Sequence, residues 1–337
     1  MVRDKRMGFG LQAVLASLLV AVIFLGGCTT TQNEKVYHVG VLSGLSFVAD
    51  ITDGLKAKMT ELGYTEGKNI VYDVQETNVD PAAYRQVLNK FVANKVDLIL
   101  AFPTEVALEA KAATQGIGIP VVFANAVIEN TGLVNSVREP GGNITGVRFS
   151  TSDLALRRFE ILHELAPHAK QMWIPYQRGY PIVASQLGAL QPVAASAGVT
   201  MIEVPADNAT ELETNLQTRV KSSDISSDAI LCIVEPLMTM PDTLAVLGKF
   251  AAEHKLPIGG CPISNNSSGS IFMTAPDNVD VGKLAASIAD KILKGTPAGT
   301  IPVVTPESRL RINYKVIQEL GLNVSEGLLN RADEIIR

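Results

Sequence analysis

The chain has 337 residues, which is long enough for two domains that each bury a core of their own. Its composition is that of an ordinary globular protein, with 47% hydrophobic and 19% charged residues. The formal net charge of −5 at pH 7 argues against a nucleic-acid partner, because binding to phosphate requires an excess of basic residues.

The first 28 residues have the pattern of a secretion signal. Basic residues precede an uncharged run, residues 11–24, that is shorter than a membrane span and leads into Leu-Gly-Gly-Cys ending at Cys28. This ending resembles the lipobox of bacterial lipoproteins, in which the cysteine becomes the lipidated first residue. We therefore expect a signal peptide over residues 1–28, a lipid anchor at Cys28 on the extracytoplasmic face of a membrane, and a polar tether over residues 29–35. A short transmembrane anchor is the alternative.

Apolar runs and helical patterns alternate from residue 37 onward. The run at residues 96–102 ends at Pro103 and is followed by a helical stretch, as expected for a buried parallel strand and its crossover helix. Further strands are predicted at residues 37–42, 68–75 and 119–124, with helices at residues 50–62 and 84–93. This alternation predicts a parallel sheet that helices cover on both faces.

The same design repeats after a turn cluster at residues 140–143. The apolar run at residues 228–234 is followed by a helical stretch to His254 and another apolar run at residues 256–260. Other strands of this half are predicted at residues 171–174 and 199–204, with helices at residues 154–165, 184–197 and 209–220. The chain is therefore expected to be an α/β protein with two Rossmann-like lobes.

The segments after residue 270 must complete these lobes. We expect residues 270–305 to join residues 36–149 in an N-terminal lobe, and residues 306–337 to join residues 150–269 in a C-terminal lobe. The chain would then cross between the lobes three times, near Phe149, Met273 and Pro306. Several crossings form a hinge, and a hinge allows closure over a ligand.

Candidate ligand-binding residues are those that directly follow predicted strands, because ligands of open α/β sheets bind outside the carboxyl ends of the strands. In the first half they are Ser43, Phe47, Phe102, Pro103, Thr104, Glu105 and Asn125; in the second they are Tyr176, Arg178, Tyr180, Glu235 and Ser264. Their aromatic members favour a small ligand with an apolar or aromatic body.

The charged candidates suit the two ends of an amino acid. Arg178, with the Thr104 hydroxyl and the helix start behind it, would bind a carboxylate, and Glu235 or Glu105 would bind an ammonium group. We therefore expect a hydrophobic or aromatic amino acid or a close relative. Solvated positions at the rim of the site are the alternative for Glu105, Arg178 and Glu235.

No catalytic constellation is present in the sequence. The four histidines are scattered without metal-ligand spacing, and no nucleophile elbow occurs, so we expect neither an enzyme nor a metal or cofactor site. Cys232 lies inside an apolar run, where cysteine is usually a small buried hydrophobic residue. A disulfide between Cys232 and Cys261 is possible, but free thiols are the expected state.

Five framework segments are similar to one protein family. They are residues 61–70 (ELGYTEGKNI), 95–100 (KVDLIL), 140–147 (PGGNITGV), 292–307 (ILKGTPAGTIPVVTPE) and 328–335 (LLNRADEI). They resemble the substrate-binding lipoproteins of ABC transporters that include tryptophan- and other aromatic-amino-acid-binding members. The similarity extends from about residue 36 to the end, and it implies a type I periplasmic-binding-protein fold with two lobes and three hinge crossings.

The resemblance also implies partners. A member of this family would be a monomer that delivers a small molecule to an ABC permease. A ligand-sensing subunit for a membrane signalling protein is the alternative, since the same fold would serve both roles. The predicted pocket loops at residues 102–105, 176–180 and 235–236 depart from the family pattern, so the resemblance does not identify the ligand.

Overall fold

The computed structural model describes residues 35–45, 48–77, 80–220, 228–263 and 269–337. The expected signal peptide with Cys28, most of the tether, and the candidates Phe47 and Ser264 lie outside these ranges. Residues 37–337 form one unit of mutually contacting structure. Within the described ranges, no helix combines the length and apolarity needed to span a membrane.

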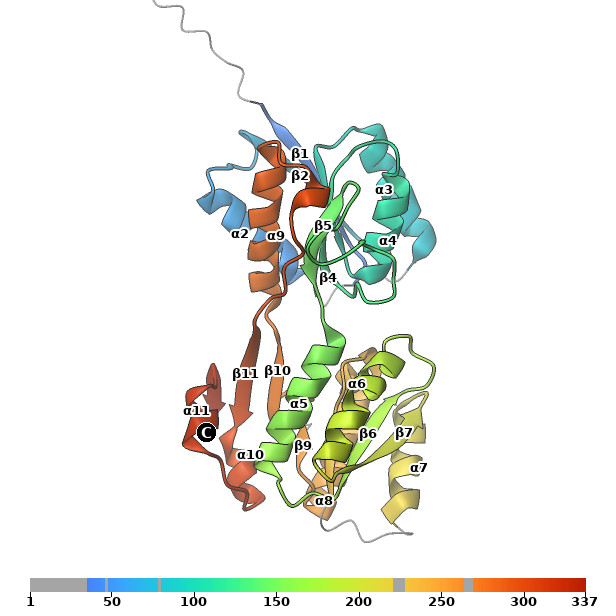
Figure 1. Ribbon diagram of the computed structural model, residues 1–337, viewed down its shortest axis with the longest axis vertical. Helices are drawn as coiled ribbons and strands as arrows, with labels where there is room; N and C mark the ends of the chain where they lie inside the picture. The colour runs from blue at the N-terminus through green and yellow to red at the C-terminus, as the bar shows by residue number, and fades with distance from the viewer. Residues whose placement is uncertain (1–34, 46–47, 78–79, 221–227, 264–268) are drawn as a thin grey trace, which may run out of the picture. The chain divides into compact units, whose positions relative to one another are not determined.

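The first sheet consists of five parallel strands in the order β2-β1-β3-β4-β5 (Figure 1). The strands are β1 (Tyr37–Ser43), β2 (Ile70–Glu76), β3 (Leu98–Phe102), β4 (Val121–Ala126) and β5 (Ile144–Arg148). All five residues of the central β3 are buried, as expected for a parallel strand covered on both faces.

Helices cover both faces of this sheet. One face packs against α2 (Asp50–Glu61) and α9 (Asn278–Leu293), and the other packs against α3 (Pro81–Ala93) and α4 (Thr104–Ala113). Glycines let α2 and α9 approach closely, because a Cβ atom on Gly54 would lie 2.0 Å from the carbonyl oxygen of Val279 and one on Gly282 would lie 2.1 Å from that of Ile51. This fit attaches α9, which begins at Asn278, to a sheet whose last strand in the sequence ends at Arg148.

The second sheet has seven strands in the order β12-β11-β10-β9-β8-β6-β7, and only β10 and β11 pair antiparallel. They are β6 (Gln171–Gln177), β7 (Thr200–Ala206), β8 (Asp228–Leu231), β9 (Ile258–Gly259), β10 (Ser270–Pro276), β11 (Ser308–Asn313) and β12 (Glu334–Ile336). The buried sides of α5 (Thr151–Leu165) and α6 (Val183–Ser196) pack on one face, and those of α7 (Ala209–Val220) and α8 (Pro241–His254) on the other. The short helices α10 (Tyr314–Glu319) and α11 (Glu326–Asn330) join the α5 side.

The position of β10 corrects one expectation. Residues 270–276 were expected to belong with the first half, but β10 pairs with β9 and β11 in the second sheet. The crossing expected near Met273 therefore comes later, after Pro276, where the Asp277 carboxylate caps α9 by accepting a hydrogen bond from the amide of Asp280 at 3.1 Å. An apolar strand can pair in either sheet, and its sequence alone does not say which edge is free.

The chain passes between the two sheets three times. The first passage joins β5 to α5, and the second joins β10 to α9. The third leads to β11 from the segment around Val304, a residue that pairs with Val147 of β5. Arg148 lies on the first passage, and its side chain donates hydrogen bonds to Thr305 on the third passage and to Glu129. The first and third passages are thus linked by this side chain as well as by a backbone hydrogen bond from the amide of Arg148 to the carbonyl oxygen of Val304 at 2.9 Å.

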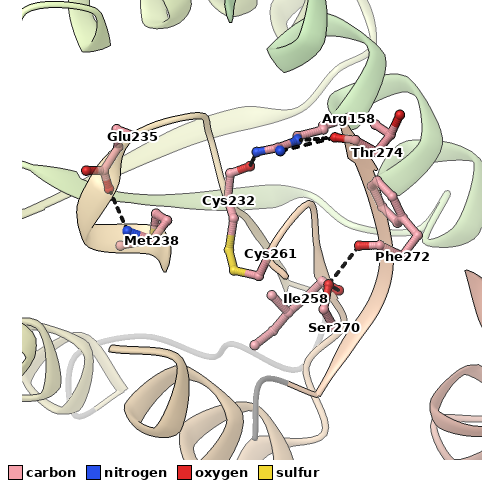
Figure 2. The surroundings of a disulfide bond; sticks show 9 residues. All are labelled: Arg158, Cys232, Glu235, Met238, Ile258, Cys261, Ser270, Phe272 and Thr274. Carbon is pink, nitrogen blue, oxygen red and sulfur yellow. Dashed lines mark hydrogen bonds between the residues drawn. A yellow bond between two sulfur atoms is a disulfide. The ribbon is translucent and has the colours of Figure 1, made fainter. Parts of the chain in front are cut away.

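A disulfide joins Cys232 to Cys261, so the expectation of free thiols was wrong (Figure 2). The two Cα atoms are 5.3 Å apart, within the range that a disulfide requires. The cause is strand pairing: Leu231 of β8 lies opposite Gly259 of β9, so the residues that follow these strands emerge side by side. Both cysteines are fully buried.

Breaking this disulfide should destabilise the fold. The bond closes a loop of 29 residues, and the chain-entropy relation for that length gives roughly 3 to 4 kcal/mol. Denaturant unfolding should show a loss of this size for Cys232→Ala/Cys261→Ala, and added reductant should destabilise the parent but not this double variant. Detection of two reactive thiols in the unreduced, denatured parent lacking Cys28 would contradict the assignment.

Candidate ligand-binding site

A cavity of about 320 Å³ lies where strands of both sheets end. Its lining is mainly apolar and comes from the ends of strands β1, β3, β4, β5, β6, β8 and β9 and the segments after them, together with parts of β10, α5 and α9. This volume is at the lower end of the range for small-molecule sites. The position is the one expected for a ligand site of parallel α/β sheets, outside the carboxyl ends of the strands.

On the side of the first sheet, the start of α4 reaches the cavity. Thr104 is the first residue of this helix, and its Oγ1 accepts a hydrogen bond from the amide of Val127 at 3.0 Å. That bond leaves the hydroxyl hydrogen of Thr104 available to a ligand. Asn125, at the end of β4, lines the same side with a left-handed backbone conformation (φ 49°), which asparagine tolerates better than most residues.

On the side of the second sheet, Glu235 follows β8 and is 4% exposed. Its carboxylate caps the 3₁₀ turn Pro236–Thr239 by accepting hydrogen bonds from the amides of Leu237 at 2.8 Å and Met238 at 3.2 Å. Burial outweighs these hydrogen bonds and raises the pKa of Glu235 to about 7. Burial also raises the pKa of Tyr180 in the same lining, with smaller contributions from the carboxylates of Glu105 and Glu235.

Arg158 of α5 also lines the cavity, and it is 6% exposed. Its Nη1 donates to the carbonyl oxygen of Cys232 at 3.0 Å, while Nη2 and Nε donate to that of Thr274 at 3.1 and 3.3 Å (Figure 2). Burial lowers the pKa of Arg158 to about 10, so the side chain stays charged at neutral pH. The cavity therefore presents a buried cation and a buried acid.

A model of the ABC transporter substrate binding protein family matches residues 39–336. The chain belongs to this family. It is 26% identical over 339 residues to a tyrosine-binding protein of Clostridioides difficile, with 96% of this chain and 94% of the relative covered.

Solved structures agree with this assignment. A conserved domain protein of Vibrio cholerae is 25% identical, with 89% of this chain and 100% of that one covered and a TM-score of 0.72. An ABC domain of Streptococcus pneumonia in complex with L-Trp is 23% identical, with 90% and 100% covered and a TM-score of 0.71. The fold is the type I periplasmic-binding-protein fold, and the family resemblance read from the framework segments is confirmed.

This substrate-binding protein is not an enzyme, since its family binds solutes. Within the part of the chain that the structure describes, no three His, Cys, Asp or Glu side chains are grouped so that they could hold a metal ion. The chemistry available at the cavity is recognition by hydrogen bonds, charge and apolar contact.

The structure brings half of the sequence-predicted ligand-binding residues to the cavity: Pro103, Thr104, Glu105, Asn125, Tyr180 and Glu235. Ser43 and Phe102, the last residues of their strands, are buried in the sheet instead. The Tyr176 hydroxyl donates to Glu203 on the neighbouring strand at 2.6 Å. Because successive side chains of a strand point to opposite faces, the last residue of a strand does not necessarily face the site.

Arg178 is not among the residues that line this cavity. Its guanidinium forms ion pairs with Asp207 at 2.7 Å and with Glu211, and its side chain is 49% exposed. Both arms of the guanidinium are thus engaged by carboxylates of the β7–α7 segment. The carboxylate-binding role expected for Arg178 has no support from this placement, and Arg158 is the basic residue at the cavity.

Sequence reasoning missed Arg158, although a signal was present. The buried positions of α5 are Thr151, Leu154, Ala155, Arg158, Phe159, Ile161, Leu162 and Leu165, so this arginine occupies the apolar face of an amphipathic helix. A charged residue in such a position requires an explanation, because arginine is almost never fully buried without a partner.

The raised pKa of Glu235 predicts how stability depends on pH. The folded protein holds this proton up to about pH 7, whereas the unfolded chain releases it near its ordinary value of about 4.3. The stabilising contribution is therefore complete below that ordinary value and is lost as the pH rises toward 7. In denaturant unfolding of the ligand-free protein, the free energy of unfolding should fall as the pH rises from about 4 to about 8, and this fall should be absent from Glu235→Gln.

Glu253→Gln is the control for this measurement. It removes a carboxylate from an exposed position of α8 and should behave as the parent. Equal pH dependence in the Glu235 variant and the parent would contradict the assignment.

Proposed function

We propose that this protein is a lipid-anchored receptor on the extracytoplasmic face of a membrane, which binds a small solute in the cavity and delivers it to an ABC permease. The observation that carries the proposal is the cavity itself, an apolar space at the strand ends with a buried cation and a buried acid in its wall. The three passages between the sheets support a hinge, and closure about a hinge would enclose the solute.

The solute that best fits this wall is an amino acid with an apolar or aromatic side chain, or a close relative. A buried charge is costly unless it is paired, and a zwitterion supplies a carboxylate for Arg158 and an ammonium group next to which Glu235 can ionise. A neutral sugar would leave both without a charged partner. The relatives named for tyrosine binding and crystallised with L-Trp support the same class.

The lipid anchor is supported by the signal-like N-terminus that ends in Leu-Gly-Gly-Cys. Residues 29–35, mainly polar, would connect Cys28 to the first strand. A receptor tethered in this way stays near the permease, so its effective concentration at the permease is high.

Lipidation of Cys28 is tested by metabolic labelling in a bacterial host. The parent should incorporate a clickable fatty acid and fractionate with membranes, and Cys28→Ala should lose the label because the acceptor thiol is gone. Thr31→Ala, three residues along the tether, is the matched control and should label as the parent does. Unchanged labelling of Cys28→Ala would rule out the anchor at this residue.

Occupancy of the cavity is tested by a thermal-shift screen of amino acids, nucleosides and sugars. A true ligand at about 100 times its dissociation constant should stabilise the parent by roughly 2.7 kcal/mol. Ala275→Trp should abolish this stabilisation, because Ala275 lines the cavity and the indole would fill it. Ala252→Trp on the exposed side of α8 should retain it. Full stabilisation of Ala275→Trp would place the ligand elsewhere.

A further inference from the structure

The charge of Arg158 is buried without an anionic partner. Among the described residues, its hydrogen bonds go to two backbone carbonyls, those of Cys232 and Thr274, and no carboxylate forms an ion pair with it. Burial is the cause of its lowered pKa, with no contribution from a neighbouring charge. Carbonyl groups orient a guanidinium but do not neutralise it, so an uncompensated cation lies in the cavity wall.

The surroundings fix the position of this guanidinium. Its two carbonyl partners lie just after β8 and within β10, on either side of β9, and the disulfide joins the segment after β8 to the segment after β9 (Figure 2). Gly260 makes room for the aliphatic part of the side chain, because a Cβ atom there would lie 2.8 Å from Cδ of Arg158. The site is therefore formed before a ligand arrives, which lowers the entropic cost of binding.

The guanidinium also retains donors for a ligand. Arginine has five N–H groups, and the structure pairs three of them, one on each nitrogen. The two remaining N–H groups, one on each terminal nitrogen, have no partner among the described residues. A carboxylate is an anion that can accept hydrogen bonds from both terminal nitrogens of a guanidinium.

The charged residues of the cavity lining favour one kind of anionic ligand over another. Arg158 is the one basic residue in the described lining, whereas Glu105 and Glu235 are acidic. A phosphate dianion would gain one cation, and it would also face the Glu105 side chain and keep Glu235 from ionising. A single carboxylate, carried by a molecule that also has a cationic group, meets both signs.

We propose that Arg158 is the anion-binding residue of the cavity and that the solute presents a carboxylate to it. This inference rests on the proposed function, since it concerns the solute of the same cavity, and it assigns one end of that solute to one residue. Glu105 and Glu235 are then available to the other, cationic end of the solute. Because of Arg158, the cavity would bind a carboxylate more tightly than the corresponding amide or amine.

The test compares matched probes on the full-length protein in detergent, by calorimetry. The probes are L-tyrosine, L-tyrosinamide, tyramine and 3-(4-hydroxyphenyl)propionate, with the corresponding four indole compounds. For the parent, removal of the carboxylate should weaken binding on the order of 100-fold, because one partner of a buried charged pair is lost. Removal of the ammonium group alone should leave measurable binding.

Variants assign this discrimination to Arg158. Arg158→Gln should bind the amino acid about as weakly as the parent binds the amide, while its affinity for the amide stays unchanged, an outcome that a damaged cavity would not give. Arg157→Gln removes the same charge from the exposed neighbouring position of α5 and should behave as the parent. If Arg158→Gln does not fold, Arg158→Lys, which keeps the charge but loses the planar fork, should weaken carboxylate binding about tenfold and leave amide binding unchanged.

The proposal would be overturned if the parent bound acid and amide with equal affinity, or if it bound none of the carboxylate probes at millimolar concentration. It would also be overturned if Arg158→Gln still bound the acid more tightly than the amide, or if Arg158→Lys bound carboxylates as tightly as the parent. The proposed function is judged separately. A neutral sugar or nucleoside that stabilises the parent but not Ala275→Trp would keep the receptor role and remove the anion-binding role of Arg158.

Discussion

Parallel strands must be covered on both faces, because their near-continuous apolar sequences expose hydrophobic side chains above and below the sheet. In this protein the requirement is met twice, by α2 with α9 and α3 with α4 on the first sheet, and by α5 with α6 and α7 with α8 on the second (Figure 1). Once both faces of a sheet are covered, the strand ends are the remaining places where main chain and polar side chains can meet a solute. The cavity lies at those ends.

The same requirement explains why the chain returns to a sheet that it has already left. Without α9, one face of the first sheet would be covered by α2 alone, and Val281, Ala285, Ile288 and Ala289 show how much of the missing core α9 supplies. Its return creates two of the three passages between the sheets. Three passages between the sheets are thus a consequence of completing the core, and the hinge proposed above would lie on them.

The charged groups of the cavity wall contribute little to the apolar core, and they suit the ligand proposed above. Among the described residues, Arg158 and Glu235 are the acidic and basic side chains that are buried, and each is held by backbone groups rather than by an opposite charge. Buried ionisable groups of this kind are concentrated at functional sites, because they reduce stability unless they are used. The disulfide between the segments that follow β8 and β9 holds part of this wall in place.

Local patterns in the sequence were enough to predict the alternation of strands and helices, the two α/β halves of the chain and the protein family. Those features depend on residue periodicity and on short framework segments, and the sheets and the family match agree with them. Half of the ligand-binding candidates also line the cavity. They were chosen because ligands of parallel α/β sheets bind outside the carboxyl ends of the strands, and strand ends can be located from the sequence.

Only the tertiary structure decided which sheet receives β10, whether Cys232 meets Cys261, and which arginine faces the cavity. Each of these depends on contacts between segments far apart in the chain: pairing with β11, the register of β8 on β9, and the acceptors Asp207 and Glu211 that engage Arg178. The position of Arg158 on the buried face of α5 is visible in the sequence. What it faces there depends on how α5 packs across β8, β9 and β10, and no local pattern encodes that packing.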